Sequence, residues 1–191
     1  MAISEIDPRT ALVVIDLQRG IVRMPVVHSA DAVVANSVRL VQAFRKRSLP
    51  VVLVHVGFAA DGADAVKTRT DAGKNAAPMQ FPPDFLEYVD ELDVQPSDLK
   101  VLKHQWGAFY GTDLDLQLRR RGVTGIVLCG ISTSIGVEST ARSAWEHNYN
   151  IAFASDAMTD MVEENHNRSL VGIFPRIGEV GTTDDILAAL G

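Results

Sequence analysis

The sequence predicts an α/β fold: a single domain of three layers (α/β/α) with a mainly parallel, doubly wound sheet between two layers of helices. Short apolar runs rich in β-branched residues alternate along the chain with segments whose apolar residues recur at helical spacing. The 191 residues suffice for one domain with a substantial core, and neither an internal repeat nor a linker divides them. We therefore expect one domain over residues 1–191.

The first half of the chain is expected to supply three strands, at residues 11–15, 50–56 and 98–102. The first two are short apolar runs, which are typical of strands buried on both faces of a parallel sheet. Between them, apolar residues recur every three or four positions, which predicts a helix over 31–47. Residues 58–83 show no period and are too long for an ordinary connection, so we interpret them as a loop or lid. A short helix is expected over 84–92.

The second half continues the alternation. A helix containing Leu114 and Leu118 is expected to end at Arg121, because the following Gly122 can stop it. Further elements are expected as strands at 125–129 and 150–154, helices at 134–146 and 162–174, and a short terminal strand and helix. In a parallel sheet of this kind, ligands bind outside the carboxyl ends of the strands, where the strand order reverses.

Composition disfavours several classes of function. The chain has 18 basic and 24 acidic residues, a net charge of −6 and no basic stripe, so nucleic-acid binding is disfavoured. No apolar run reaches the roughly 20 residues that span a bilayer, and the N-terminus lacks the pattern of a signal peptide. The single cysteine, Cys129, excludes an intrachain disulfide and fits a reducing compartment. We expect a cytoplasmic protein with no membrane partner.

Three residues of chemical interest fall at predicted strand ends. Asp16 follows the first strand, Lys103 follows the third, and Gly136 lies at the start of the helix after the fourth. A strand-end Asp is often only a turn cap, and a strand-end Lys is often a solvated charge. Their coincidence at one edge of the sheet predicts a functional site there. The helix start also presents backbone N–H groups that favour an anion.

Three segments resemble motifs of the isochorismatase-like hydrolases, the cysteine hydrolase superfamily. They are Val13-Val-Ile-Asp-Leu-Gln18, Val101-Leu-Lys-His-Gln-Trp-Gly-Ala-Phe109 and the run from Gly130 to Arg142. The resemblance implies that Asp16 and Lys103 are catalytic. Many members carry a nucleophilic cysteine where this chain has Gly136, which has no side chain to attack with. The resemblance further implies a cis peptide between Ile131 and Ser132, in a turn that directs backbone N–H groups toward the substrate.

The chain is similar in this respect to the siderophore- and phenazine-pathway isochorismatases, which also have Gly at the cysteine position. The resemblance implies hydrolysis of an enol ether or related small acid without a covalent cysteine intermediate. An acid protonates the enol-ether carbon, and water captures the oxocarbenium ion. Asp16 would be the acid and Lys103 its electrostatic partner. A nearby ammonium favours ionised Asp, whereas burial favours the protonated acid, and the sequence leaves that balance open.

Two other functions stay open at this point. Asp16 could activate water for attack on an amide or another carbonyl. Alternatively, the protein could be a catalytically silent member that binds a small ligand or serves as an assembly partner. A pure binding role does not need Asp16 and Lys103 together, which argues against the silent member. The resemblance also implies a homo-oligomer acting on a small-molecule substrate.

Further substrate contacts are expected around this pair. Gln18 belongs to the first motif, and Trp106 and Phe109 follow Lys103 closely, although aromatic residues here are as often plain core. Arg69, in the long loop, could supply a cation for a carboxylate or could lie on a solvated face. No cofactor is expected. The resemblance to nicotinamidase-like relatives, which bind a metal through an Asp and two His near the second strand and the lid, implies no metal site here, because His55 has no histidine partner between residues 57 and 83. Cys129 is expected to be buried within its strand.

Overall fold

Six parallel strands form the centre of the protein, in the order β3-β2-β1-β4-β5-β6. The computed structural model describes residues 3–75 and 81–191. The strands are β1 (Thr10–Ile15), β2 (Val51–Val56), β3 (Leu99–Lys103), β4 (Gly125–Ile131), β5 (Asn150–Thr159) and β6 (Glu179–Gly181). The strand order reverses between β1 and β4, which places the switch point of the sheet at their carboxyl ends.

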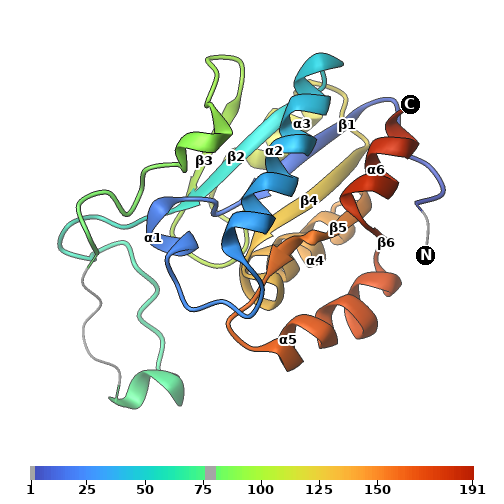
Figure 1. Ribbon diagram of the computed structural model, residues 1–191. Helices are drawn as coiled ribbons and strands as arrows, with labels where there is room; N and C mark the ends of the chain where they lie inside the picture. Colours follow the sequence, from blue (N-terminus) through green and yellow to red (C-terminus); the bar gives the residue numbers. More distant parts are fainter. Residues whose placement is uncertain (1–2, 76–80) are drawn as a thin grey trace.

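Helices cover both faces of this sheet (Figure 1). The α-helices are α1 (Arg19–Val22), α2 (Ala30–Lys46), α3 (Leu114–Arg120), α4 (Glu138–Glu146), α5 (Glu163–Arg168) and α6 (Thr183–Leu190). Short 3-10 and π turns complete the structure: η1 (Ala72–Asn75), η2 (Asp90–Leu92), η3 (Thr133–Val137), η4 (Ser169–Ile173) and η5 (Phe174–Arg176). Apolar residues of α2 and α6 pack on one face, and those of α3 and α4 on the other. The prediction of a three-layer, doubly wound α/β domain is confirmed.

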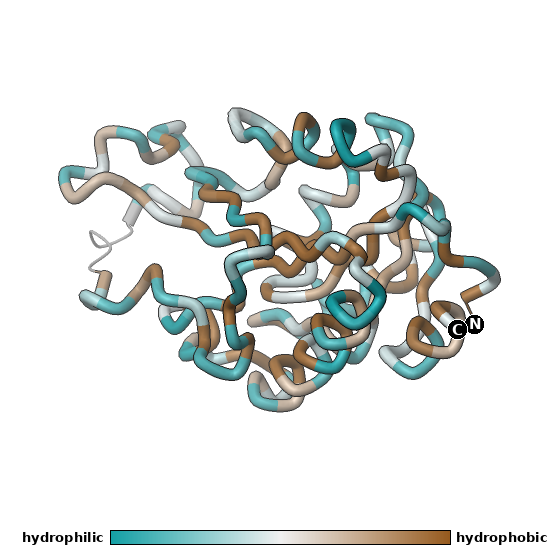
Figure 2. Tube along the Cα trace, turned by 90° about the horizontal axis from the view of Figure 1, so that it is seen from above, coloured by the Kyte–Doolittle hydropathy of each residue, from teal (hydrophilic) through white to brown (hydrophobic). Residues whose placement is uncertain are grey.

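Apolar residues concentrate in the strands and on the inner sides of the helices (Figure 2). All six residues of β1 are buried, as expected for a central strand covered on both faces. The helices follow their local signals. Ser29 caps the start of α2, Thr182 and Asp185 form a capping box at α6, and Gly122, at φ +65°, follows the end of α3.

Three predicted elements differ from the structure. Residues 84–92 were expected to form a helix, but only Asp90–Leu92 are helical, because the residues before them bond to the chain after β1. The helix predicted over 162–174 is divided into α5, η4 and η5. β5 continues to Thr159, past its expected end, through a register shift opposite β4.

The long connection between β2 and β3 projects from the body of the protein, with η1 near its outer end (Figure 1). Residues 58–71 contain no helix or strand, as the lack of a period in the sequence predicted. Residues 76–80 of the predicted loop lie outside the described part of the chain. In the described part, no helix is both long enough and apolar enough to cross a membrane.

Candidate active site

Asp16 and Lys103 form a buried ion pair at the carboxyl edge of the sheet. Lys103 Nζ donates a hydrogen bond to Asp16 Oδ2 over 2.7 Å, which confirms that the two side chains lie within salt-bridge distance. Asp16 is 5% exposed and Lys103 is 2% exposed. Asp16 directly follows β1 in the left-handed region, at φ +52°, which a non-glycine residue adopts only when its surroundings hold it there. Lys103 is the last residue of β3 and reaches across β2 to meet it.

Burial governs the protonation of Asp16. The pKa of Asp16 is raised from 3.8 to about 6, because desolvation by burial outweighs the charge and hydrogen bond of Lys103, which lower it. Asp16 Oδ1 is buried and has no hydrogen-bond partner among the described residues. Lys103 Nζ also donates to the carbonyl oxygen of Gln105, 3.2 Å away. The pair therefore combines a buried lysine side chain with a carboxyl group whose second oxygen has no hydrogen-bond partner among the described residues.

Gly136 lies directly beside the pair. A Cβ atom at this position would stand 3.2 Å from Asp16 Oδ2, 3.6 Å from Lys103 Nζ and 2.9 Å from Ile15 Cγ2. A side chain at position 136 would thus begin close to the charged groups of the pair. The close approach of β4 to β1 depends on Gly130, at φ +117°, where a Cβ would stand 2.0 Å from the Ile15 carbonyl oxygen. Three sequence-distant strand ends therefore meet at one site.

Asp160 anchors the turn between β4 and η3, and the sequence analysis had not identified this residue. The peptide bond between Ile131 and Ser132 is cis, at the position that the resemblance implies. The Ser132 carbonyl accepts hydrogen bonds from the N–H groups of Ile135 and Val137. The Ser134 N–H donates to Asp160 Oδ2 over 2.7 Å. These three amides have partners within the protein, so an anion in the crevice would have to use other donors.

Comparison with known proteins identifies the family of this chain. The Isochorismatase domain family matches residues 10–185 of the chain. The chain belongs to the isochorismatase family. The isochorismatase family protein YwoC of Bacillus subtilis is 51% identical over 179 residues, which are 94% of this chain and 93% of YwoC. The phenazine biosynthesis protein PhzD of Pseudomonas fluorescens is 29% identical over 185 residues, or 95% of this chain and 87% of PhzD.

Solved structures give the same assignment. An isochorismatase family protein from Burkholderia thailandensis superposes with a TM-score of 0.94 at 50% identity, covering 99% of each chain. The N-carbamoylsarcosine amidase from Thermoplasma acidophilum has a TM-score of 0.74 at 27% identity, covering 92% of this chain and 97% of the amidase. The isochorismatase family thus includes close relatives of this chain along its whole described length.

The aromatic residues after Lys103 do not enclose the Asp16 carboxyl of this isochorismatase-family site as expected. Phe109 is buried in the core beside α3 and α4 and stacks on His147, with ring centroids 5.2 Å apart. Its expected role in the pocket wall is therefore corrected to packing. Trp106 is 65% exposed, which also speaks against a place in an enclosed wall. Arg69 is exposed on the long connection, where its contact with a substrate stays a prediction.

Gln18 takes a different position from the one expected. Its side chain is fully buried, and both of its N–H donors bind backbone carbonyls, those of Val56 and Phe85. The structure thus assigns Gln18 to the scaffold around Asp16 and not to the surface that a substrate meets. The residue that the sequence interpretation missed, Asp160, does follow a strand end. The sequence analysis ended this strand at residue 154, so Asp160 was not recognised as a strand-end residue.

Two further expectations concern cysteine and metal. Cys129 is fully buried in β4, and desolvation raises the pKa of its thiol to about 12, so it is not a nucleophile poised for attack. Within residues 3–75 and 81–191, no group of three or more His, Cys, Asp or Glu side chains is arranged to hold a metal ion.

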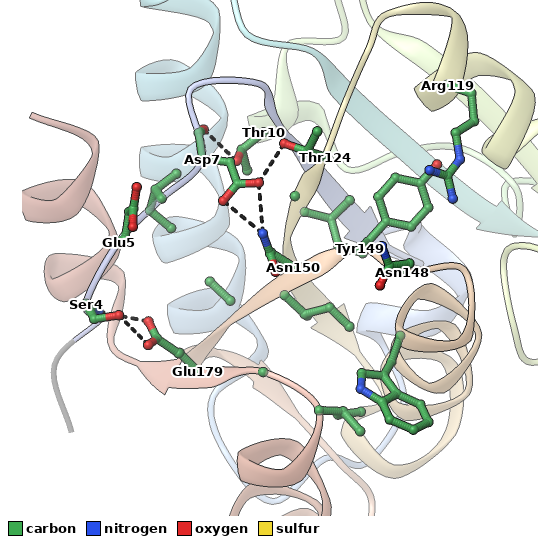
Figure 3. Close-up of a pocket in the computed structure, with 18 residues that line it drawn as sticks. Ser4, Glu5, Asp7, Thr10, Arg119, Thr124, Asn148, Tyr149, Asn150 and Glu179 are labelled. Atoms are coloured by element: carbon green, nitrogen blue, oxygen red, sulfur yellow. Dashed lines mark hydrogen bonds between the residues drawn. The ribbon is translucent and has the colours of Figure 1, made fainter.

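A hollow of about 620 Å³ lies at the opposite, amino edge of the sheet (Figure 3). It is bordered by Thr10 and Asn150, which begin β1 and β5. Its central carboxylate, Asp7, accepts hydrogen bonds from Thr124 Oγ1 and Asn150 Nδ2, and Glu179 accepts from Ser4. None of the predicted site residues borders this hollow. Because Asp7 and Glu179 are occupied by internal partners and the predicted residues lie elsewhere, we seek the chemistry of the protein at the Asp16–Lys103 edge.

Proposed function

We propose that this isochorismatase-family protein hydrolyses an enol ether or a related small acid, without a covalent cysteine intermediate. The observation that carries this proposal is the buried Asp16–Lys103 pair, in which Asp16 is 5% exposed and burial raises its pKa to about 6 despite the adjacent ammonium. Burial therefore keeps a useful fraction of this carboxyl group protonated close to neutral pH. A protonated carboxyl group at the crevice is what general-acid catalysis needs.

In the proposed reaction, Asp16 transfers its proton to the terminal carbon of the enol ether. The electron pair of the carbon–carbon double bond forms the new C–H bond, and the ether oxygen shares the positive charge of the resulting oxocarbenium ion. Water adds to that ion and loses a proton to Asp16, giving a hemiketal. Collapse of the hemiketal breaks the carbon–oxygen bond and releases an alcohol and a keto acid. Asp16 thus serves first as acid and then as base.

Lys103 acts as the electrostatic partner in this proposal. When Asp16 gives up its proton, a carboxylate forms in a buried place where an isolated charge is costly. The Lys103 ammonium, 2.7 Å from Oδ2, stabilises that carboxylate. The same ammonium prevents the pKa of Asp16 from rising so far that proton transfer would become difficult. The two residues therefore set the acidity between them.

Gly136 contributes by having no side chain. A side chain there would extend over the Asp16–Lys103 pair, since its Cβ would lie within 4 Å of both charged groups. With Gly136, that volume is left to a substrate or to the water that attacks it, and no group is present to form a thioester. The similarity to PhzD, a phenazine biosynthesis protein, favours this chemistry over a cysteine mechanism.

Amide hydrolysis is the alternative, and the similarity to N-carbamoylsarcosine amidase favours it. Here Asp16 would act as a base that activates water, so it would have to be ionised. The two hypotheses require opposite protonation states of one carboxyl group, which makes pH the discriminating variable. A catalytically silent ligand-binding protein is the third possibility.

The test is a screen of pyruvate enol ethers and small amides, with products identified by mass spectrometry. Release of a keto acid and an alcohol, abolished in Asp16→Asn, would support the proposal. Turnover of amides alone would favour the water-activating alternative. The absence of turnover from any enol ether, amide or ester would favour the silent binding protein.

We also propose that the protein forms a homo-oligomer. Trp106 and Tyr110 are 65% and 82% exposed, and large exposed aromatic side chains are typical of protein interfaces. Sedimentation analysis of the wild type beside Trp106→Ser tests this. We expect a dimer or larger assembly for the wild type and a shift toward monomer for the variant; a monomeric wild type would contradict the proposal.

A further inference from the structure

Gln18 is the most completely engaged polar side chain near the candidate site. It lies two residues after Asp16 and is 0% exposed. Its Nε2 donates to the carbonyl oxygens of Val56, at 3.0 Å, and Phe85, at 2.9 Å. Its Oε1 accepts from the Val56 N–H over 2.8 Å. One amide therefore joins the chain after β1, the end of β2 and the segment around Phe85.

The segment around Phe85, residues 84–90, lies across the chain that follows Asp16, and we call it the strap. The backbone N–H groups of Arg19 and Gly20 donate to the carbonyls of Glu87 and Phe85, and the Val89 N–H donates to Leu17. Ion pairs reinforce these bonds, since Arg19 contacts Asp90, and Arg23 holds Asp84 through two hydrogen bonds. The ion pairs are at the surface, so the strap depends mainly on its backbone hydrogen bonds and on the Gln18 amide.

Two glycines provide space for the strap. A Cβ on Gly20 would stand 2.0 Å from the Phe85 ring, and a Cβ on Gly57 would stand 2.3 Å from the Leu86 side chain. Phe85 and Leu86 therefore pack directly against the backbone of Gly20 and Gly57, where any larger residue would fill the space that they occupy. These contacts fix the position of the strap, and the Gln18 amide lies in the middle of them.

We infer that Gln18 is a positioning residue that fastens the strap to β2 and thereby holds Asp16 in a dry position beside Lys103. The inference rests on the proposed function only in taking Asp16 as the working carboxyl group. The backbone of Asp16 is in the left-handed region and is bonded to β2 through its N–H and the Val54 carbonyl. Gln18 adds the next attachment to the same strand, at Val56, and so fixes the chain on both sides of Leu17.

The chemical consequence concerns water. If Gln18 loses its hydrogen bonds, Val56 and Phe85 keep polar backbone groups that need new partners, and water is the available one. Water entering beside Asp16 would solvate the carboxylate and remove the desolvation that now favours the protonated form. Gln18 therefore influences the acidity of Asp16 without touching a substrate.

The experiment compares Gln18→Leu with Gln95→Leu. Leucine keeps the approximate volume and removes the amide, while Gln95 is a control amide that bonds a single backbone carbonyl, that of Asp93. Titration of Asp16 by carbon-13 NMR of the carboxyl group and hydrogen exchange of residues 84–90 are measured without substrate. In Gln18→Leu we expect the midpoint of Asp16 to move from about 6 toward 3.8 and strap exchange to quicken at least about tenfold.

Gly20→Ala gives a second approach if Gln18→Leu folds poorly, because it displaces the Phe85 ring and leaves Gln18 and Asp16 intact. It should shift both measurements in the same direction. A variant that loses thermal stability but keeps the Asp16 midpoint would show a purely structural role and overturn the inference. So would a moved midpoint with unchanged strap exchange. Failure of the proposed function would appear separately, as a wild type that hydrolyses nothing while these two measurements still respond.

Discussion

The carboxyl groups at the two edges of the sheet differ in their exposure to solvent and in their hydrogen-bond partners. At the amino edge, a hollow of about 620 Å³ is lined by carboxylates that hydrogen-bond to neighbouring side chains (Figure 3). At the carboxyl edge, Asp16 and Lys103 are nearly closed off from solvent, and Asp16 Oδ1 has no partner among the described residues. In the open region Asp7 and Glu179 are engaged by internal partners, whereas the buried Asp16 keeps one oxygen without such a partner.

This contrast shows why the size of a concavity is a poor guide to chemistry in this protein. A carboxylate such as Asp7, held by Thr124 and Asn150, contributes to stability and has little left to offer a ligand. A buried carboxyl group with a raised pKa and an oxygen without a partner, such as Asp16, costs stability locally, and groups of this kind are found at functional sites more often than elsewhere. The predictions below test whether substitutions at the carboxyl edge change activity and whether substitutions at the amino edge change stability.

The largest effect is expected from Asp16→Asn. Asparagine keeps the shape but cannot transfer a proton, so turnover should fall about 10²–10⁴-fold. Product formation by mass spectrometry measures this, and circular dichroism checks that the fold is kept. Asp7→Ala, at the amino edge, is the matched control and should keep turnover within about twofold. Equal losses in both variants would erase the distinction between the edges.

A second test introduces a thiol by Gly136→Cys. The new side chain would point at Asp16 and Lys103, whose ammonium favours a thiolate. The Ile15 side chain must shift slightly, since the new Cβ stands 2.9 Å from its Cγ2. We expect alkylation by iodoacetamide at least about 10²-fold faster than at buried Cys129, measured by intact mass. Rapid labelling of Cys129 in the wild type, or an inert thiol at position 136, would contradict the site described here.

Replacing the cation should have a smaller effect. In Lys103→Met the carboxylate that forms during turnover loses its partner, and we expect a loss of roughly 10–10²-fold in kcat. Because Lys103 lowers the pKa of Asp16, its removal should also raise the midpoint of the acid group above about 6. Lys100→Met, an exposed change on the same strand, is the control. A lowered midpoint in Lys103→Met would mean that the two groups are not coupled as described.

The pH profile of the wild type separates the two hydrolytic hypotheses. Asp16 has a pKa raised to about 6, so it is protonated below that value and ionised above it. If it acts as an acid, kcat/KM should fall about tenfold per pH unit above pH 6. If it acts as a base, kcat/KM should rise through pH 6 and then level. A profile flat between pH 5 and 8 would remove Asp16 from the rate-determining chemistry.

The smallest effect on activity is expected at the amino edge, where the readout is stability. Asp7→Ala removes the acceptor for Thr124 and Asn150, so the free energy of unfolding should fall by about 1–2 kcal/mol. Urea denaturation measures this change. A variant with unchanged stability would show that the network in Figure 3 is solvated and contributes little.

Much of this arrangement could be predicted from the sequence, because the strands of a buried parallel sheet appear in it as apolar runs. β1, β2 and β4 were expected close to their observed positions, and Asp16 and Lys103 could be placed together because parallel strands end at one edge. The burial of Cys129 followed from its place in such a run. These features depend on local pattern and on the topology common to α/β sheets.

What escaped prediction depends on tertiary contacts between distant segments. Residues 84–90 are not helical, since they bond to the chain after Asp16. Phe109 packs in the core beside His147, and nothing in its neighbourhood in sequence distinguishes a core aromatic from a pocket wall. Gln18 serves the backbone of two other segments, which only the folded chain brings together. The role of Asp160 beneath the β4 turn was hidden by the extension of β5.

The position of β3 in the sheet has one further consequence. Among the described strands, β3 lies at the edge and pairs with β2, whereas β1 is central. Edge strands open by local unfolding at lower free energy than central strands. Each opening of β3 would carry Lys103 away and leave Asp16 without its cation. We therefore expect the local stability of β3 to determine how long Asp16 and Lys103 stay in contact. Thermal inactivation is then expected to begin at temperatures where the core is still folded.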